Sequence, residues 1–140
     1  MSLTRIYTKT IVIPASVIDE NGHVNNVAYV QWMQDIAVEH YSFLGGLEVQ
    51  KPFGTWFIRE HKVEYLLPAF TGDRIEIRTW VENVRRVQSL RKYEFVRESD
   101  GRLLVRGETE WVFVDAATGE LRAIPEEVKA LFQTMTENFS

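Results

Sequence analysis

The sequence predicts an α+β domain in which one long helix packs against a mostly antiparallel sheet. Residues 27–44 have helical periodicity, with apolar side chains around most of the circumference. Four β-rich segments follow in direct succession, and strands joined by short connections usually pair antiparallel. No linker, repeat or low-complexity segment divides the 140 residues, so we expect a single domain spanning residues 1–140.

The first predicted elements are a strand, a polar loop and the long helix. Residues 5–13 are rich in β-branched side chains and end at Pro14, which predicts a strand. Residues 14–25 form the loop. The helix is expected over about residues 27–44, with Asn25 or Asn26 as its N-cap and Gly45-Gly46 as its stop signal.

The polar residues of this helix occupy one narrow stripe: Gln31, Asp35, Glu39 and Ser42. Most of the remaining circumference is apolar: Tyr29, Val30, Trp32, Met33, Ile36, Ala37, Tyr41, Phe43 and Leu44. Such a helix is buried on well over half of its surface, so we expect the sheet to curl around it. His40 lies in the apolar arc and is predicted to be a core histidine with a hydrogen-bond partner.

The predicted strands cover residues 55–67, 73–87, 89–98 and 102–115, with turn signals at Gly72-Asp73, Asp100-Gly101 and Ala117-Thr118-Gly119. Tyr93 and Phe95 alternate with Lys92 and Glu94. In the last strand, Leu103, Val105, Thr109, Trp111 and Phe113 share a face opposite Arg106, Glu108 and Glu110. The apolar face is expected to cover the helix. Pro125 opens a short amphipathic helix that contains Val128, Leu131 and Phe132.

Composition excludes several functional classes. The absence of cysteine excludes disulfides and thiolate nucleophiles, and His23, His40 and His61 make a poor ligand set, so no metal is expected. The net charge of −4 argues against nucleic acid as a partner. No apolar run is long enough to span a membrane, and the N-terminal residues lack a signal-like segment. We therefore expect a cytoplasmic protein.

The most distinctive segment is Asp19-Glu20-Asn21-Gly22-His23-Val24-Asn25-Asn26, directly before the helix. A carboxylate can act as nucleophile or general base, while a helix N-terminus offers unpaired N–H groups that stabilise an oxyanion. The alternative is purely structural, because Asx residues before glycine commonly form turns and asparagine commonly caps helices. On the residues alone, both interpretations stay open.

The element order, the length and this segment resemble hotdog-fold thioesterases of the 4-hydroxybenzoyl-CoA thioesterase type. The resemblance covers about residues 5–125, and the string D-x-N-x-H-V-N-N is similar to the active-site motif of plant acyl-ACP thioesterases. It implies a hotdog fold, a curved sheet wrapped around one central helix. It also implies hydrolysis of an acyl-CoA or acyl-ACP thioester without a cofactor.

The resemblance also implies roles for individual residues. The family's acid, three positions before the loop glycine Gly22, corresponds to Asp19, and its carbonyl-polarising N–H corresponds to Asn26. Asn21 and His23 match residues that support the acid. Val17 stands where many bacterial members have a second acidic residue, which leaves open whether Asp19 attacks the thioester or activates water. The acyl chain is expected beside the helix, near Tyr29 and Trp32.

The stretch from Arg85 to Arg106 carries seven basic and three acidic residues, a net +4 that leaves −8 for the rest of the chain. Solvated strand faces are one interpretation. The other is that Arg85, Arg86 and Arg91 meet the phosphates of coenzyme A at the surface.

Two alternative functions remain. Hotdog enoyl-CoA hydratases or dehydratases use a D-x-N-x-x-H pattern, one residue longer than the spacing here, and a non-catalytic acyl-binding hotdog protein would retain Asp19 incidentally. Because active sites of hotdog proteins lie between subunits, we expect a homodimer or a homotetramer. Glu60 or His61 could reach a neighbouring subunit's site, although a solvated strand face is the simpler expectation.

Overall fold

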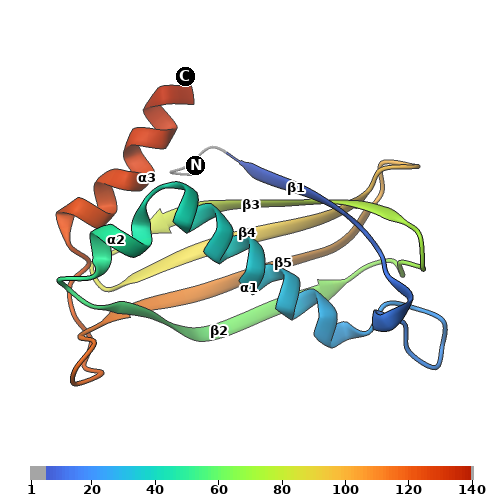
Figure 1. Cartoon of the computed structure of the whole chain (residues 1–140), viewed down its shortest axis with the longest axis horizontal. Helices are drawn as coiled ribbons and strands as arrows, with labels where there is room; N and C mark the ends of the chain where they lie inside the picture. Colours follow the sequence, from blue (N-terminus) through green and yellow to red (C-terminus); the bar gives the residue numbers. More distant parts are fainter. Residues whose placement is uncertain (1–5, 140) are drawn as a thin grey trace.

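The computed structural model describes residues 6–139, with side chains described as far as residue 132. Its elements are β1 (Tyr7–Val12), the 3₁₀ helix η1 (Ala15–Val17), α1 (Asn26–Phe43), α2 (Gly46–Gln50), β2 (Thr55–Tyr65), β3 (Arg74–Val84), β4 (Gln88–Arg97), β5 (Leu103–Val114) and α3 (Glu126–Phe139) (Figure 1). The predicted α+β class and the order of the long elements are confirmed, and η1 and α2 are additions. Arg5, part of the predicted first strand, lies outside the described residues.

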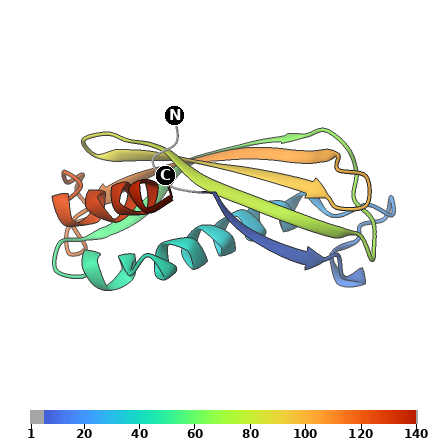
Figure 2. The ribbon, with the colours of Figure 1, turned by 90° about the horizontal axis from the view of Figure 1, so that it is seen from above.

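The sheet has five strands in the order β1-β3-β4-β5-β2, and every neighbouring pair is antiparallel. Helix α1 runs along one face, and α2 and α3 lie on the same side, near the C-terminal end of α1 (Figures 1 and 2). In the described part of the chain, no helix covers the opposite face. The sheet therefore encloses its core only between itself and the helices.

The main core lies between α1 and the central strands. Side chains from β3 and β4, such as Ile77 and Phe95, pack with Met33 of α1, and each buried side chain of this kind contributes about 1.5–3 kcal/mol. Gly107 of β5 allows the close approach, because a Cβ there would lie 3.0 Å from Met33 Sδ. The missing side chain of Gly107 on the sheet thus leaves room for the Met33 side chain on the helix.

Helix α1 ends within one residue of its predicted bounds. At its start, the Asn25 side chain accepts a hydrogen bond from the Val27 N–H at 2.8 Å. At its end, Gly45 adopts a left-handed conformation with φ 82°, which terminates the helix. Although the inner side of α1 is buried, Phe43 is 67% exposed and Val27 is 73% exposed. A single chain therefore leaves part of the apolar circumference of α1 uncovered.

A register shift in β2 changes which of Glu60 and His61 faces solvent. The pairing of β2 with β5 shifts between Ile58 and Glu60, and an extra residue reverses which side chains face the core. After the shift His61 is half-buried, with Nδ1 2.9 Å from Thr109 Oγ1, while Glu60 is exposed. The expectation of a solvated strand face is therefore wrong for His61.

The opposite face of the sheet is charged. Arg106 pairs with Glu64, and Arg78 lies 3.6 Å from Glu94. At the end of β4, Arg97 pairs with both Asp73 and Asp100. Several charges of the basic stretch are therefore neutralised locally, as expected of a solvated strand face.

Candidate functional site

The Asp19–Asn26 segment folds into a tight loop between η1 and α1. An isolated bridge pairs Ile18 with Val24, and the Asp19 N–H donates to the His23 carbonyl at 2.8 Å. Gly22 donates its N–H to the Asp19 carbonyl at 3.1 Å and has φ 79°, a conformation that favours glycine. The loop is therefore held by its own backbone.

The Asp19 carboxylate is exposed, yet its direction is defined. Its Oδ1 accepts the backbone N–H groups of Asn21 at 2.9 Å and His23 at 3.2 Å. Within the described residues, neither of these two side chains bonds to Asp19, and the His23 ring instead packs edge-on against Phe70 at 5.6 Å. Asn21 and His23, which were predicted to support the acid, orient the Asp19 carboxylate through their backbone N–H groups.

The first turn of α1 leaves one donor available. Asn25 accepts the N–H groups of Val27 and Ala28, whereas the Asn26 N–H has no hydrogen-bond acceptor among the residues that the structure describes. The Tyr65 hydroxyl donates to the Asn26 carbonyl at 3.2 Å and so ties β2 to this end of the helix. No acidic residue occupies the first turn, so the positive end of the helix dipole is not offset there.

Tyr29 and Trp32 lie just inside this helix end. Tyr29 is buried and packs edge-on against Trp32, Tyr65 and Phe95, with ring centroids 5.1–5.7 Å apart. Burial raises the pKa of Tyr29 to about 12. Trp32 is half-buried beside it. Sequence reasoning identified these two residues but missed Tyr65, which is distant in sequence and contacts both Tyr29 and Asn26.

The three arginines of the predicted phosphate site do not lie together. Arg85 and Arg86 are exposed in the β3–β4 turn, while β3 begins beside the loop, where the Asp73 carbonyl accepts the Ile13 N–H. The eleven residues of β3 separate the loop near its start from the turn at its end by roughly 35 Å. Within one chain, therefore, the β3–β4 turn that carries Arg85 and Arg86 lies at the opposite end of the sheet from the loop that precedes α1 (Figure 1).

Arg91 is only 4% exposed, so the prediction that it faces the surface is wrong. The reason is strand periodicity: Arg91 shares the face of Tyr93 and Phe95, which are both buried. This signal was present in the sequence, because Tyr93 and Phe95 alternate with charged residues.

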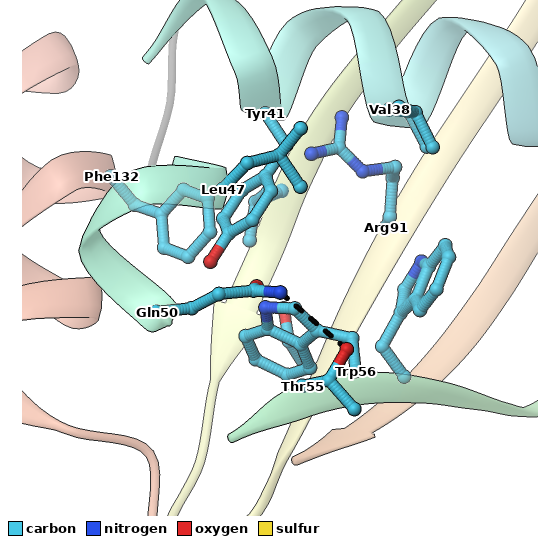
Figure 3. A pocket seen from close by; sticks show the side chains of 12 residues that line it. Val38, Tyr41, Leu47, Gln50, Thr55, Trp56, Arg91 and Phe132 are labelled. Atoms are coloured by element: carbon cyan, nitrogen blue, oxygen red, sulfur yellow. Dashed lines mark hydrogen bonds between the residues drawn. The ribbon is translucent and has the colours of Figure 1, made fainter. Parts of the chain in front are cut away.

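The Arg91 side chain lines a cavity of about 190 Å³ beside the C-terminal half of α1 (Figure 3). The lining comes from all three helices and from four strands: Ala37, Val38, Tyr41, Leu47, Gln50, Thr55, Trp56, Val81, Ser89, Arg91, Trp111 and Phe132. Sequence reasoning did not find this cavity, because its walls come from seven separate elements.

Arg91 Nη1 lies 2.9 Å from His40 Nδ1 and donates to Thr79 Oγ1 at 3.1 Å. Because arginine only donates, His40 Nδ1 must accept and its proton sits on Nε2. Burial, assisted by the Arg91 charge, lowers the pKa of His40 to about 3. The prediction of a core histidine with a hydrogen-bond partner is confirmed.

Among the side chains that the structure describes, no three His, Asp or Glu residues converge as a metal site would require. The helices of the same part of the chain include none that is long and apolar enough to cross a membrane.

Comparison with solved structures identifies the fold. A hypothetical protein from Staphylococcus aureus, solved in complex with CoA, superposes with a TM-score of 0.85 at 20% identity, over 96% of this chain and 86% of that chain. The 1,4-dihydroxy-2-naphthoyl-CoA thioesterase from Synechocystis gives a TM-score of 0.81 at 16% identity, over 91% and 96% of the two chains. The 12:0-ACP thioesterase from Umbellularia californica gives 0.84 at 20% identity, over 93% of this chain but only 50% of that one.

Sequence comparison places the chain in a family. No curated protein matches it. A family model described as the thioesterase-like superfamily matches residues 13–132. The resemblance inferred from the loop and the element order is thus confirmed, and the chain belongs to the thioesterase-like superfamily, with the hotdog fold.

Proposed function

We propose that this protein hydrolyses an acyl thioester of coenzyme A or of acyl carrier protein, with Asp19 as the reacting carboxylate. One observation carries the proposal. The loop that orients Asp19 by two backbone N–H groups continues directly into α1, whose first residue, Asn26, keeps an unused N–H. A carboxylate and an oxyanion donor therefore come from one short, rigid segment.

The mechanism follows from these two groups. The carbonyl oxygen of the thioester accepts the Asn26 N–H, and the helix dipole stabilises the negative charge that develops there. As general base, Asp19 takes a proton from water while the water oxygen bonds to the carbonyl carbon. The C–S bond then breaks, and the proton passes to the departing thiolate. As nucleophile, the Asp19 carboxylate would instead attack the carbonyl carbon and expel the thiolate, which takes a proton from water, and a water molecule would then cleave the mixed anhydride to release the free acid and regenerate Asp19.

The choice of carrier rests on the similar structures. One of them is a CoA complex and another is an acyl-ACP thioesterase, which supports either thiol as the leaving group. Tyr29 and Trp32 form an apolar wall about one to two helical turns from Asn26, consistent with an acyl chain starting beside them.

We also propose a cytoplasmic homo-oligomer built on a dimer. In the described residues β2 pairs only with β5, so its other edge is open along eleven residues. Phe57, 52% exposed on this strand, and Val38, 50% exposed on α1, are apolar groups that a second copy could cover. Antiparallel pairing of two β2 strands would also bring the Arg85–Arg86 turn of one subunit closer to the Asp19 loop of its partner.

The first experiment is a thiol-release assay with a panel of acyl-CoA and acyl-ACP substrates of different chain lengths. Hydrolysis that saturates with substrate is the expected result. Hydration of an enoyl-CoA without thiol release would instead identify a hydratase. Acyl-CoA binding without turnover would identify a binding protein.

A further inference from the structure

The cavity beside the C-terminal half of α1 contains a buried cation with no carboxylate partner. Arg91 is 4% exposed, and both of its contacts are neutral acceptors, His40 Nδ1 and Thr79 Oγ1. No Asp or Glu among the described residues pairs with it. Removing a charge from water costs several kcal/mol, so buried charges normally have partners of opposite sign.

Other polar atoms of the lining are also incompletely paired. Gln50 Oε1 is buried without a hydrogen bond, whereas the Tyr41 hydroxyl and Trp111 Nε1 lie near Trp56 and Tyr93 but make no hydrogen bond of good geometry. The hydroxyl and the indole N–H are donors. Together with the guanidinium, whose Nε and Nη2 have no acceptor among the described residues, they are suited to bind oxygen atoms of an anion.

The rest of the lining is apolar: Ala37, Val38, Leu47, Trp56, Val81 and Phe132. Figure 3 shows Arg91 extending from β4 toward α1, with Tyr41 and Val38 on either side. A cavity of about 150 Å³ is enough to bind benzene, so about 190 Å³ accommodates one ring, or a short chain, with a carboxylate attached.

We propose that this cavity binds a small, mostly apolar carboxylic acid of about the size of benzoate, with its carboxylate on Arg91. A carboxylate matches the single charge and the planar fork of the guanidinium, whereas a phosphate would bring more charge and more acceptors than the donors present. The acid is either free or the far end of an acyl group. The binding site itself does not depend on the proposed hydrolysis.

The first test compares benzoate with benzamide, which has the same shape and no charge. The fluorescence of Trp56 and Trp111, which line the cavity, reports binding, and a rise in Tm confirms it. We expect benzoate to bind saturably and at least about tenfold more tightly than benzamide, since hydrogen bonds between charged groups are stronger than those to a neutral amide. Equal affinities, or no saturation with benzoate at millimolar concentrations, would overturn the proposal.

The second test changes Arg91. Arg91→Met keeps most of the volume and removes a buried charge that has no carboxylate partner, which offsets part of the loss of the hydrogen bonds to His40 and Thr79, so the variant is expected to fold with reduced stability. It should lose the preference for benzoate, whereas Arg91→Lys should retain it with lower affinity, and Arg102→Met, a change in an exposed arginine, should bind benzoate as wild type does. Wild-type benzoate binding by a folded Arg91→Met protein would refute the proposal. If Arg91→Met does not fold, Arg91→Lys decides: it must still prefer benzoate over benzamide.

A third test separates the two sources of the acid. Hexadecanedioyl-CoA and hexadecanoyl-CoA have acyl chains of the same length, long enough to follow α1 over the roughly 21 Å from Asn26 to His40, but only the first ends in a carboxylate. If the cavity holds the end of an acyl group, wild type favours hexadecanedioyl-CoA in kcat/KM and Arg91→Met loses this preference. If it holds a free acid, both thioesters react alike while benzoate still binds. Failure to hydrolyse any thioester would count against the proposed function alone, because benzoate titration needs no turnover.

Discussion

The charged side chains near the two ends of α1 are stabilised in opposite ways. At the N-terminal end, the exposed carboxylate of Asp19 is oriented by backbone N–H groups of its own loop. Near the C-terminal end, the Arg91 cation is buried and is held by side chains from α1 and β3. A charge that water and local backbone satisfy can be removed with little effect on folding. A charge in the core is coupled to the stability of the whole domain.

The largest expected effect comes from Asp19→Asn, which removes the carboxylate and preserves its shape. We expect kcat to fall at least about 100-fold, as for the loss of an acid-base or nucleophilic group. The Tm should change little, because Asp19 is exposed and its amide oxygen still accepts both loop N–H groups. Thiol release and thermal melting measure the two quantities.

Glu20→Gln provides the matched control for this change, since Glu20 is the adjacent exposed carboxylate. It should keep wild-type kcat. Near-normal turnover by Asp19→Asn would exclude Asp19 from the mechanism.

Near the C-terminal end of α1, the contribution of the buried His40 to stability should depend on pH. The folded pKa of His40, about 3, lies below its ordinary value of 6.5, so between these values only the unfolded chain binds the proton. The free energy of unfolding should therefore fall as pH drops from 6.5 toward 3, by up to about 1.4 kcal/mol per pH unit. Around His40, the Arg91 guanidinium opposes protonation and the Tyr7 ring stacks at 4.9 Å.

Urea denaturation of wild type and His40→Gln at several pH values isolates this contribution from that of other titrating groups. The variant is expected to be less stable at neutral pH but to lose less stability on acidification. Parallel slopes in the two proteins would show that His40 takes up a proton in the folded state.

A moderate effect is expected from charge reversal in the β3–β4 turn. If Arg85 and Arg86 meet phosphates of coenzyme A, changing both to Glu should raise KM for acyl-CoA several-fold and leave kcat nearly unchanged, because such contacts contribute uniform binding. Salt should weaken the effect, since exposed charges are screened over about 10 Å at 0.1 M. A short thioester without the nucleotide provides the control substrate.

The long distance within one chain between this turn and Asp19 makes the experiment a test of the dimer as well. Mixing Asp19→Asn subunits with charge-reversed subunits should recover sites of normal KM if each site uses both chains. No recovery after subunit exchange, together with a monomer in light scattering, would contradict the shared site.

The smallest effect is expected at the junction of the first turn of α1 with β2. Tyr65→Phe removes the hydroxyl that donates to the Asn26 carbonyl and keeps the ring beside Tyr29. The loss should be about 0.5–1.5 kcal/mol of stability, with a small reduction in kcat. Urea denaturation and thiol release measure both, and a large loss of kcat would indicate that Tyr65 acts in the reaction itself.

The features that could be predicted from the sequence are local. The loop from Asp19 to Asn26, the Asn25 cap and the end of α1 at Gly45 depend on contacts between residues close in the chain, so residue type and spacing were enough to predict them. The strand order along the chain was also readable from alternation and turn signals.

The cavity, the inward direction of His61 and the burial of Arg91 depend on how distant segments pack together. The cavity forms where seven elements meet, and the register shift after Ile58 turns His61 inward. Arg91 acquires its unusual state because packing against α1 and β3 removes it from water without supplying a carboxylate. These features arise from contacts distant in sequence, and no single segment encodes them.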